Sequence, residues 1–170
     1  MPSASPAPLA DSYLRFLPRP LLEPRRPHLA ILAGWAMAFF PSLLLSGLVA
    51  LLPSQVARPE FEIDGTFALV MLVLFAPIAE TLIMAAALLV LLRLFRPSVA
   101  VALSAAGWAV AHSLLAPAWG LVIWWPFLVF STLFVTWRRH SLAAALAVPA
   151  LVHALHNLGP ALLLAFAVRA

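Results

Sequence analysis

The stretch Ala76-Pro77-Ile78-Ala79-Glu80-Thr81 lies inside a long apolar run, from about residue 67 to residue 92. A carboxylate such as that of Glu80 costs roughly 2.5–3.5 kcal/mol at the middle of a membrane helix on insertion scales. Pro77 loosens the backbone beside it, because proline lacks an N–H and its ring clashes with the preceding turn. A charge at such a cost is a candidate functional group, and it predicts polar partners on other helices.

The composition predicts an integral membrane protein. Of the 170 residues, 65% are hydrophobic and only 9% are charged, whereas soluble domains carry about 25% charged residues. The mean hydropathy is +1.06. The apolar runs have the length of helices rather than of the ~10-residue alternating strands of membrane barrels. We therefore expect an all-α integral membrane bundle of about five to six transmembrane helices. The chain has no Cys, which excludes disulfide and thiolate chemistry.

Five long apolar segments are the expected membrane spans. Their approximate limits are 28–52, 66–94, 98–115, 119–137 and a fifth segment that begins near residue 141. Gly159-Pro160 is expected to break the fifth span, before a short terminal helix or a continuation as far as residue 168. Residues 1–27 are rich in proline and are expected to form a mostly irregular tail near the lipid headgroups, with a short amphipathic piece at 13–16. The expected organisation is this tail followed by a bundle at 28–170.

The charge pattern predicts an orientation in the membrane. All ten basic residues are arginines and the net charge is +4. The arginines flank apolar spans, which indicates topology and anionic lipid headgroups rather than nucleic acid. Arginine-rich segments before residue 28, at 93–96 and at 138–139 alternate with a loop at 53–65, where Arg58 stands against three acidic residues, and with an uncharged loop at 116–118. Only Arg169, at the far end, falls on the opposite side. This alternation predicts a cytoplasmic N-terminus, and we expect a protein of the bacterial inner membrane.

Polar residues on three different spans are expected to share one depth. Counted at 1.5 Å per residue from the arginine-rich ends, Glu80 lies roughly 20 Å in, His112 roughly 21 Å and His153 roughly 18 Å. That layer lies past the middle of a ~30 Å hydrocarbon core, toward the outer face. Asn157 follows His153 by one helical turn and shares its face. Trp108 precedes His112 by one turn and is expected to form a wall beside it.

A layer of this kind contains the groups that hydrolysis of an amide bond needs without a Ser or Cys nucleophile. Glu80 can take a proton from water, and His112 can orient that water or move the proton. His153 and Asn157 can supply donors to a developing oxyanion, whereas His156 is expected to play a structural or supporting part. The same Glu80, His112 and His153 could instead bind a divalent metal such as zinc, which would activate the water.

Two further hypotheses stay open at this point. His112 and His153 could be the axial ligands of a b-type haem in an electron-transfer subunit. The chain could also be a non-enzymatic membrane protein, such as a scaffold or a proton-coupled protein, because intramembrane Glu and His suit proton relays.

Three short motifs carry a resemblance to a known family. They are APIAETLIM at 76–84, GWAVAH at 107–112 and HALHN at 153–157. In this order, each on its own span, they resemble the signatures of the CPBP intramembrane proteases, whose pattern is Glu-Glu-x-x-x-Arg, Phe-x-x-x-His and His-x-x-x-Asn. That family includes type II CAAX prenyl endopeptidases and Abi-type proteins. The resemblance covers a protease-like core at residues 66–160.

The resemblance implies an intramembrane endopeptidase that acts on a membrane-associated peptide or protein. It gives Glu80 the water-activating role, places the second-motif histidine at His112, and gives His153 and Asn157 the roles of assisting the water and stabilising the oxyanion. A glutamate-type mechanism requires no cofactor, whereas the older metal-dependent description of the family would require a divalent ion such as zinc.

The sequence departs from the family pattern at three positions. Thr81 stands where the pattern has its second glutamate, Ala85 where it has arginine, and Trp108 where it has phenylalanine. Losing a Glu and an Arg together is less damaging than losing one member of a pair. These departures indicate a divergent, bacterial-type member that keeps the other named residues.

Overall fold

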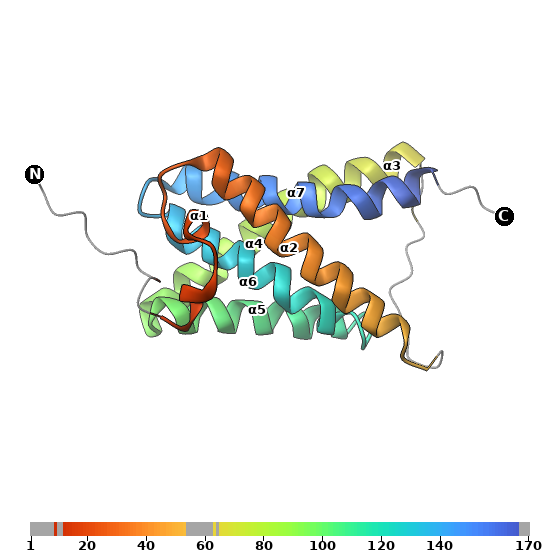
Figure 1. The fold of residues 1–170 in the computed structure, drawn as a ribbon, viewed down its shortest axis with the longest axis horizontal. Coiled ribbons are helices and arrows are strands. Elements are labelled where there is room, and N and C mark those ends of the chain that lie inside the picture. Colours follow the sequence, from red (N-terminus) through yellow and green to blue (C-terminus); the bar gives the residue numbers. More distant parts are fainter. Residues whose placement is uncertain (1–8, 10–11, 54–62, 64, 167–170) are drawn as a thin grey trace, which may run out of the picture.

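The computed structural model describes residue 9, residues 12–53, residue 63 and residues 65–166, and these residues are helical without a strand. The long helices lie side by side in a bundle, and α2 crosses the others at an angle (Figure 1). In chain order the elements are a 3-10 helix at Tyr13–Phe16, α1 (Arg19–Leu22), α2 (Pro27–Ala50), α3 (Gly65–Leu69), a π-helical turn at Val70–Phe75, α4 (Ala76–Leu94), α5 (Pro97–Ser113), α6 (Gly120–Trp137) and α7 (Leu142–Phe166).

The expected all-α membrane bundle is confirmed. Within the described residues, four helical segments are long and apolar enough to cross a membrane: Pro27–Ala50, Gly65–Leu94, Gly120–Trp137 and Leu142–Phe166. α5 is slightly shorter, with 17 residues, and packs along α6. The expected break at Gly159-Pro160 is wrong, because α7 continues through Pro160 to Phe166. Prolines are tolerated in membrane helices where neighbouring groups or local adjustments of the helix satisfy the backbone that they free.

The segment before α2 lies on the bundle rather than apart from it. A 3-10 helix occupies the expected amphipathic piece at Tyr13–Phe16, and the Tyr13 hydroxyl donates a hydrogen bond to the Ser98 carbonyl at 2.6 Å. Leucines between the prolines are buried in the core: Leu9, Leu14, Leu17, Leu21 and Leu22. The described part of the expected tail therefore packs against the helices through its leucines. Burial of these leucine side chains holds the segment against the helices.

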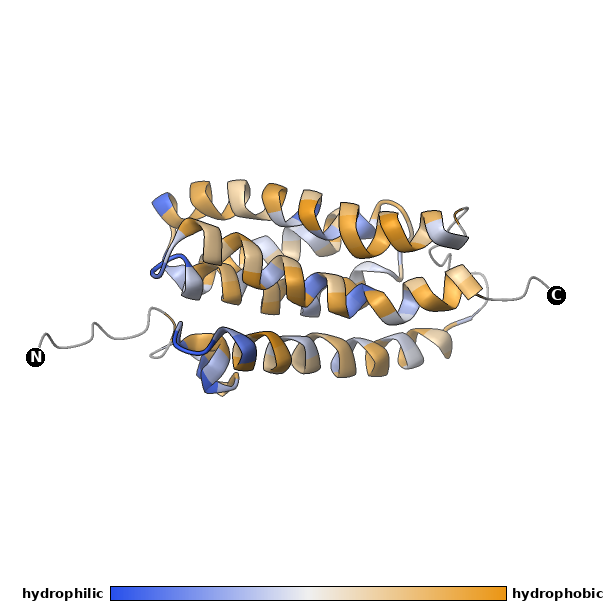
Figure 2. Cartoon of the chain, turned by 90° about the horizontal axis from the view of Figure 1, so that it is seen from above, coloured by the Kyte–Doolittle hydropathy of each residue, from blue (hydrophilic) through white to orange (hydrophobic). Residues whose placement is uncertain are grey.

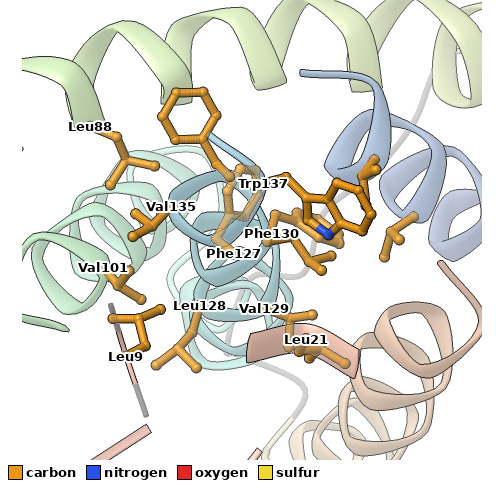
Figure 3. Packing of buried hydrophobic residues seen from close by; sticks show 14 of the residues in the cluster. Leu9, Leu21, Leu88, Val101, Phe127, Leu128, Val129, Phe130, Val135 and Trp137 are labelled. Carbon is orange, nitrogen blue, oxygen red and sulfur yellow. The ribbon is translucent and has the colours of Figure 1, made fainter. Parts of the chain in front are cut away.

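The core is built around α6, which is buried over most of its length and packs against α2, α5 and α7. Figure 3 shows this core, with Phe127 and Phe130 of α6 among side chains from the surrounding helices. Toward the C-terminal end of α6 the packing consists of large buried side chains: Met84, Leu88, Val101, Leu133, Phe134 and Trp137. These side chains leave little exposed surface in this part of the core.

Pro41 interrupts the hydrogen bonding of α2, and another helix compensates. Proline has no N–H, so the carbonyl of Met37, four residues earlier, has no donor within the helix. The Trp125 indole Nε1 of α6 donates to that carbonyl at 2.5 Å. A side chain from a second helix thus satisfies a backbone group that would otherwise be unpaired in an apolar medium.

We expect Trp125→Phe to lower the free energy of unfolding by about 1–3 kcal/mol, because it leaves the Met37 carbonyl without a donor. In a Pro41→Ala background the residue-41 N–H can reach this carbonyl, and the same substitution should cost much less. Unfolding of the purified protein in detergent measures both costs. Equal costs in the two backgrounds would contradict this account of Pro41.

The described arginines gather at one end of the bundle. They belong to the segment before α2, the α4–α5 connection and the α6–α7 connection, and all are exposed: Arg15, Arg19, Arg25, Arg26, Arg93, Arg96, Arg138 and Arg139. These three parts of the chain lie at the same end (Figure 1), and Figure 2 shows hydrophilic colours gathered there. We call this the arginine end. The α5–α6 turn and the last turns of α2 and α7 lie at the opposite end.

Candidate active site

A cavity of about 330 Å³ lies between α2, α4, α6 and α7, beside the last turn of α5. Apolar side chains form most of its wall, and its polar lining is Ser42, Ser46, Glu80, His112, His153, His156 and Asn157. The four residues singled out from the sequence therefore line one cavity. A mostly apolar cavity with a few convergent polar groups is the usual form of a small-molecule or substrate site.

Glu80 of α4 and His153 of α7 face each other across this cavity. The Glu80 Oε2 and His153 Nε2 atoms are 3.7 Å apart, with 26% and 6% of the side chains exposed. This separation is too long for a direct hydrogen bond, and a water molecule is the usual bridge between polar groups at such distances. The His153 ring stacks on Phe130, with centroids 4.6 Å apart, and meets Phe127 edge to face. Aromatic packing therefore fixes the imidazole.

His112 ends α5 and is held by its own helix and by α6. Its Nδ1 lies 2.9 Å from the Trp108 carbonyl. A carbonyl only accepts, so Nδ1 carries the proton and the Nε2 of a neutral ring is free to accept. Trp108 stacks on Phe127 with centroids 4.3 Å apart and contacts the His112 ring, as the expected wall should. Trp119 meets the same imidazole edge to face at 4.6 Å.

The turn that brings Trp119 to His112 depends on Gly120. A Cβ at residue 120 would collide with the backbone carbonyl of Ala109 and with the Ser113 hydroxyl, whereas a Cβ at Gly107 would meet nothing within 4 Å. α5 and α6 therefore approach closely only because residue 120 has no side chain.

We expect Gly120→Ala to lower the free energy of unfolding by about 1–3 kcal/mol, the usual cost of overpacking. Its matched control, Gly107→Ala, should leave stability unchanged or raise it by up to about 1 kcal/mol, because alanine is the better helix former. Thermal unfolding in detergent compares the two. Equal effects would show that the close approach at Gly120 contributes nothing.

Asn157 contacts the backbone just before the glutamate motif. Its Nδ2 donates to the Leu72 carbonyl at 3.0 Å. The chain is π-helical there, and the Ala76 N–H bonds to the Met71 carbonyl, five residues back. In that pattern the donor for Leu72 would be residue 77, which is a proline without an N–H. Pro77 thus leaves one carbonyl free and Asn157 satisfies it, so α7 is tied to the turn that leads into Glu80.

Two of the three departures from the family pattern lie on a buried face of α4. Thr81 and Ala85 are 3% and 5% exposed, so a Glu and an Arg at these positions would be charges within the packed bundle. The Thr81 hydroxyl has no hydrogen-bond partner among the described residues. Small side chains at 81 and 85 therefore suit this packing, and they leave Glu80 as the carboxylate of the cavity.

Sequence reasoning missed the contribution of α2 to the cavity. Phe39, Ser42 and Ser46 line it, and the Ser42 hydroxyl is buried without a hydrogen-bond partner among the described residues. Serines four residues apart share one helix face, so the spacing of Ser42 and Ser46 could have predicted a polar face on α2. His156 also lines the cavity, with its ring edge to face against Phe39 and Phe130. The supporting position expected for it fits this packing.

The metal hypothesis depends on how closely acidic and histidine side chains are grouped. Among the described residues, no three or more His, Cys, Asp or Glu side chains are grouped so that they could hold a metal ion. Glu80, His112 and His153 share a cavity without forming such a group.

Comparison with known proteins agrees with the resemblance of the three motifs. A family model described as type II CAAX prenyl endopeptidase Rce1-like matches residues 62–159, which is more than half of the 170-residue chain. No curated protein and no solved structure matches the chain. The matched region contains Glu80, His112, His153 and Asn157 but not α2. The chain therefore belongs to the Rce1-like family of type II CAAX prenyl endopeptidases, a family of intramembrane endopeptidases.

Proposed function

We propose that this protein is an intramembrane endopeptidase in which Glu80 activates the attacking water. The observation that carries the proposal is the placement of Glu80 opposite His153, 3.7 Å apart, in a mostly apolar cavity that His112 and Asn157 also line. Family membership supports the reaction class. The substrate class is a peptide bond of a membrane-associated protein or peptide, and the site lies in the bacterial inner membrane with the N-terminus cytoplasmic.

In this mechanism a water molecule lies between Glu80 and His153. Glu80 removes one of its protons while the oxygen attacks the peptide carbonyl, and His153 Nε2 orients the water. The carbonyl oxygen becomes an oxyanion, which the second N–H of the Asn157 amide can stabilise while the first stays on Leu72. Glu80 then returns the proton to the leaving amine. His112, which can accept at Nε2, orients the substrate or the water from the other side.

Phe127, Phe130 and Trp119 belong to the mostly apolar lining of this cavity. Interactions between charged groups are stronger in such a site than in water, which favours stabilisation of the developing charge.

The haem hypothesis gains no support from membership of a peptidase family. The scaffold hypothesis differs from the proposal only in activity.

The test is direct. Purified protein in detergent or liposomes is incubated with a library of membrane-spanning peptides, and the products are identified by mass spectrometry. The proposal expects new peptide termini that Glu80→Gln protein does not produce, with the same products in the presence of a chelator. Absence of Glu80-dependent products would favour the scaffold hypothesis, and loss of products on chelation would show that a metal takes part.

A further inference from the structure

Large buried side chains separate the cavity from the arginine end. On α6, the cavity-lining Phe130 is followed toward the arginine end by Leu133, Phe134 and Trp137, which are 0%, 0% and 3% exposed. On α4, Glu80 is followed in the same direction by Met84 and Leu88, which are fully buried. Figure 3 shows Leu88 and Trp137 within this packing. Among the described residues, these buried side chains lie between the arginine end and the catalytic residues.

The lining of the cavity continues instead toward the opposite end. It includes Trp119 at the start of α6 and Leu164 in the last turns of α7. On α2 the lining runs from Phe39 to Ser46, which is exposed. Since α2 starts at the arginine end, Ser46 lies about 19 residues, or ~29 Å, from that end. The cavity therefore reaches the surface of the bundle away from the arginines.

The charges assign the two ends to the two sides of the membrane. Loops rich in arginine and lysine stay in the cytoplasm, and this bias is strongest for short loops beside the spans. The eight described arginines are all at one end and belong to such segments. The cavity consequently faces the side of the membrane away from the cytoplasm.

From this geometry we infer that the enzyme takes its substrate from the non-cytoplasmic side, as a polypeptide segment that has already been translocated. This inference rests on the proposed function. Protein export must then come before cleavage, because it supplies the translocated segment. The scissile bond lies in the outer half of the bilayer. A lipid-modified chain end held at the cytoplasmic leaflet would meet the closed core at the arginine end instead of the cavity.

Cysteine labelling tests the side of access, because the natural chain has no Cys. Full-length variants with one cysteine are expressed, and intact spheroplasts are treated with a membrane-impermeant maleimide. Leu115→Cys, 76% exposed at the α5–α6 turn, should react, and so should Ser46→Cys in the cavity. Phe95→Cys, 44% exposed at the arginine end, should react only after lysis. Leu44→Cys, exposed on α2 but outside the cavity lining, faces lipid and should not react.

Labelling of Phe95→Cys in intact spheroplasts, or of Leu115→Cys only after lysis, would overturn the orientation. If Leu115→Cys reacted and Ser46→Cys did not, the claim that the cavity opens on the non-cytoplasmic side would be wrong. These outcomes do not depend on activity, so they are separate from the fate of the proposed function. If Glu80-dependent products are found, their new termini should map to the outer half of the substrate's span. Termini in the inner half would overturn the inference and leave the endopeptidase intact.

Discussion

Glu80→Gln protein is expected to cleave substrate at least about 100-fold more slowly than the natural protein, while it inserts and folds normally. General base catalysis contributes typically 10²–10⁴-fold, and glutamine cannot take a proton. The exchange keeps the size of the side chain and removes a carboxylate that is costly to bury. The free energy of unfolding should therefore stay the same or rise. Initial rates of product formation and detergent unfolding of the same preparations measure both quantities.

The matched control for this prediction is Glu23→Gln. Glu23 is the other acidic residue whose side chain forms an ion pair in the described structure, with Arg25 at 3.7 Å. It lies outside the cavity, in the segment before α2, and exposed pairs of this kind contribute little. Glu23→Gln should therefore retain normal activity. If Glu80→Gln retained activity as well, Glu80 would not be the base.

Asn157→Ala is expected to lower the free energy of unfolding by about 1–3 kcal/mol as well as cleavage, because it leaves the Leu72 carbonyl unpaired in an apolar environment. The distinguishing result is its dependence on Pro77. In a Pro77→Ala background the residue-77 N–H can satisfy the same carbonyl within the π-helical turn. Asn157→Ala should then cost at least about 0.5 kcal/mol less, the lower range of coupling energies between contacting residues. The double-mutant cycle is measured by unfolding four proteins in detergent: the natural protein, each single variant and the double variant.

Two comparisons make this second prediction specific. Leu158→Ala changes an outward-facing neighbour that is 37% exposed, and it should have the same small effect in both backgrounds. Cleavage should stay low in the Pro77→Ala, Asn157→Ala double variant even though stability returns, because Asn157 also serves the oxyanion. If the changes in free energy of unfolding of the two single variants simply added in the double variant, Asn157 would not hold the π-helical turn.

Much of the site could be predicted from the sequence because depth in a membrane helix follows from counting residues. The rise of 1.5 Å per residue and the apolar limits of each span placed Glu80, His112 and His153 in one layer. Their rotation about the helix axes could not be predicted in the same way. It depends on how ridges and grooves of neighbouring helices pack, and each helix here is apolar on nearly every side.

The fold class, the family, most of the span limits and the four polar residues of the cavity could be predicted from the chain alone, since hydropathy and residue spacing are local properties. The end of the last span could not, because α7 continues through Pro160. Contacts between distant residues came from the tertiary structure. Asn157 donates to Leu72, 85 positions away in the chain, and Trp125 donates to Met37, 88 positions away. Prolines leave these two carbonyls free, and a neighbouring helix lies within reach of each. Packing likewise buried the leucines before α2 and closed the cavity toward the arginine end. That packing also placed Glu80 in a cavity whose lining continues toward the end opposite the arginines, which no spacing along the chain could specify.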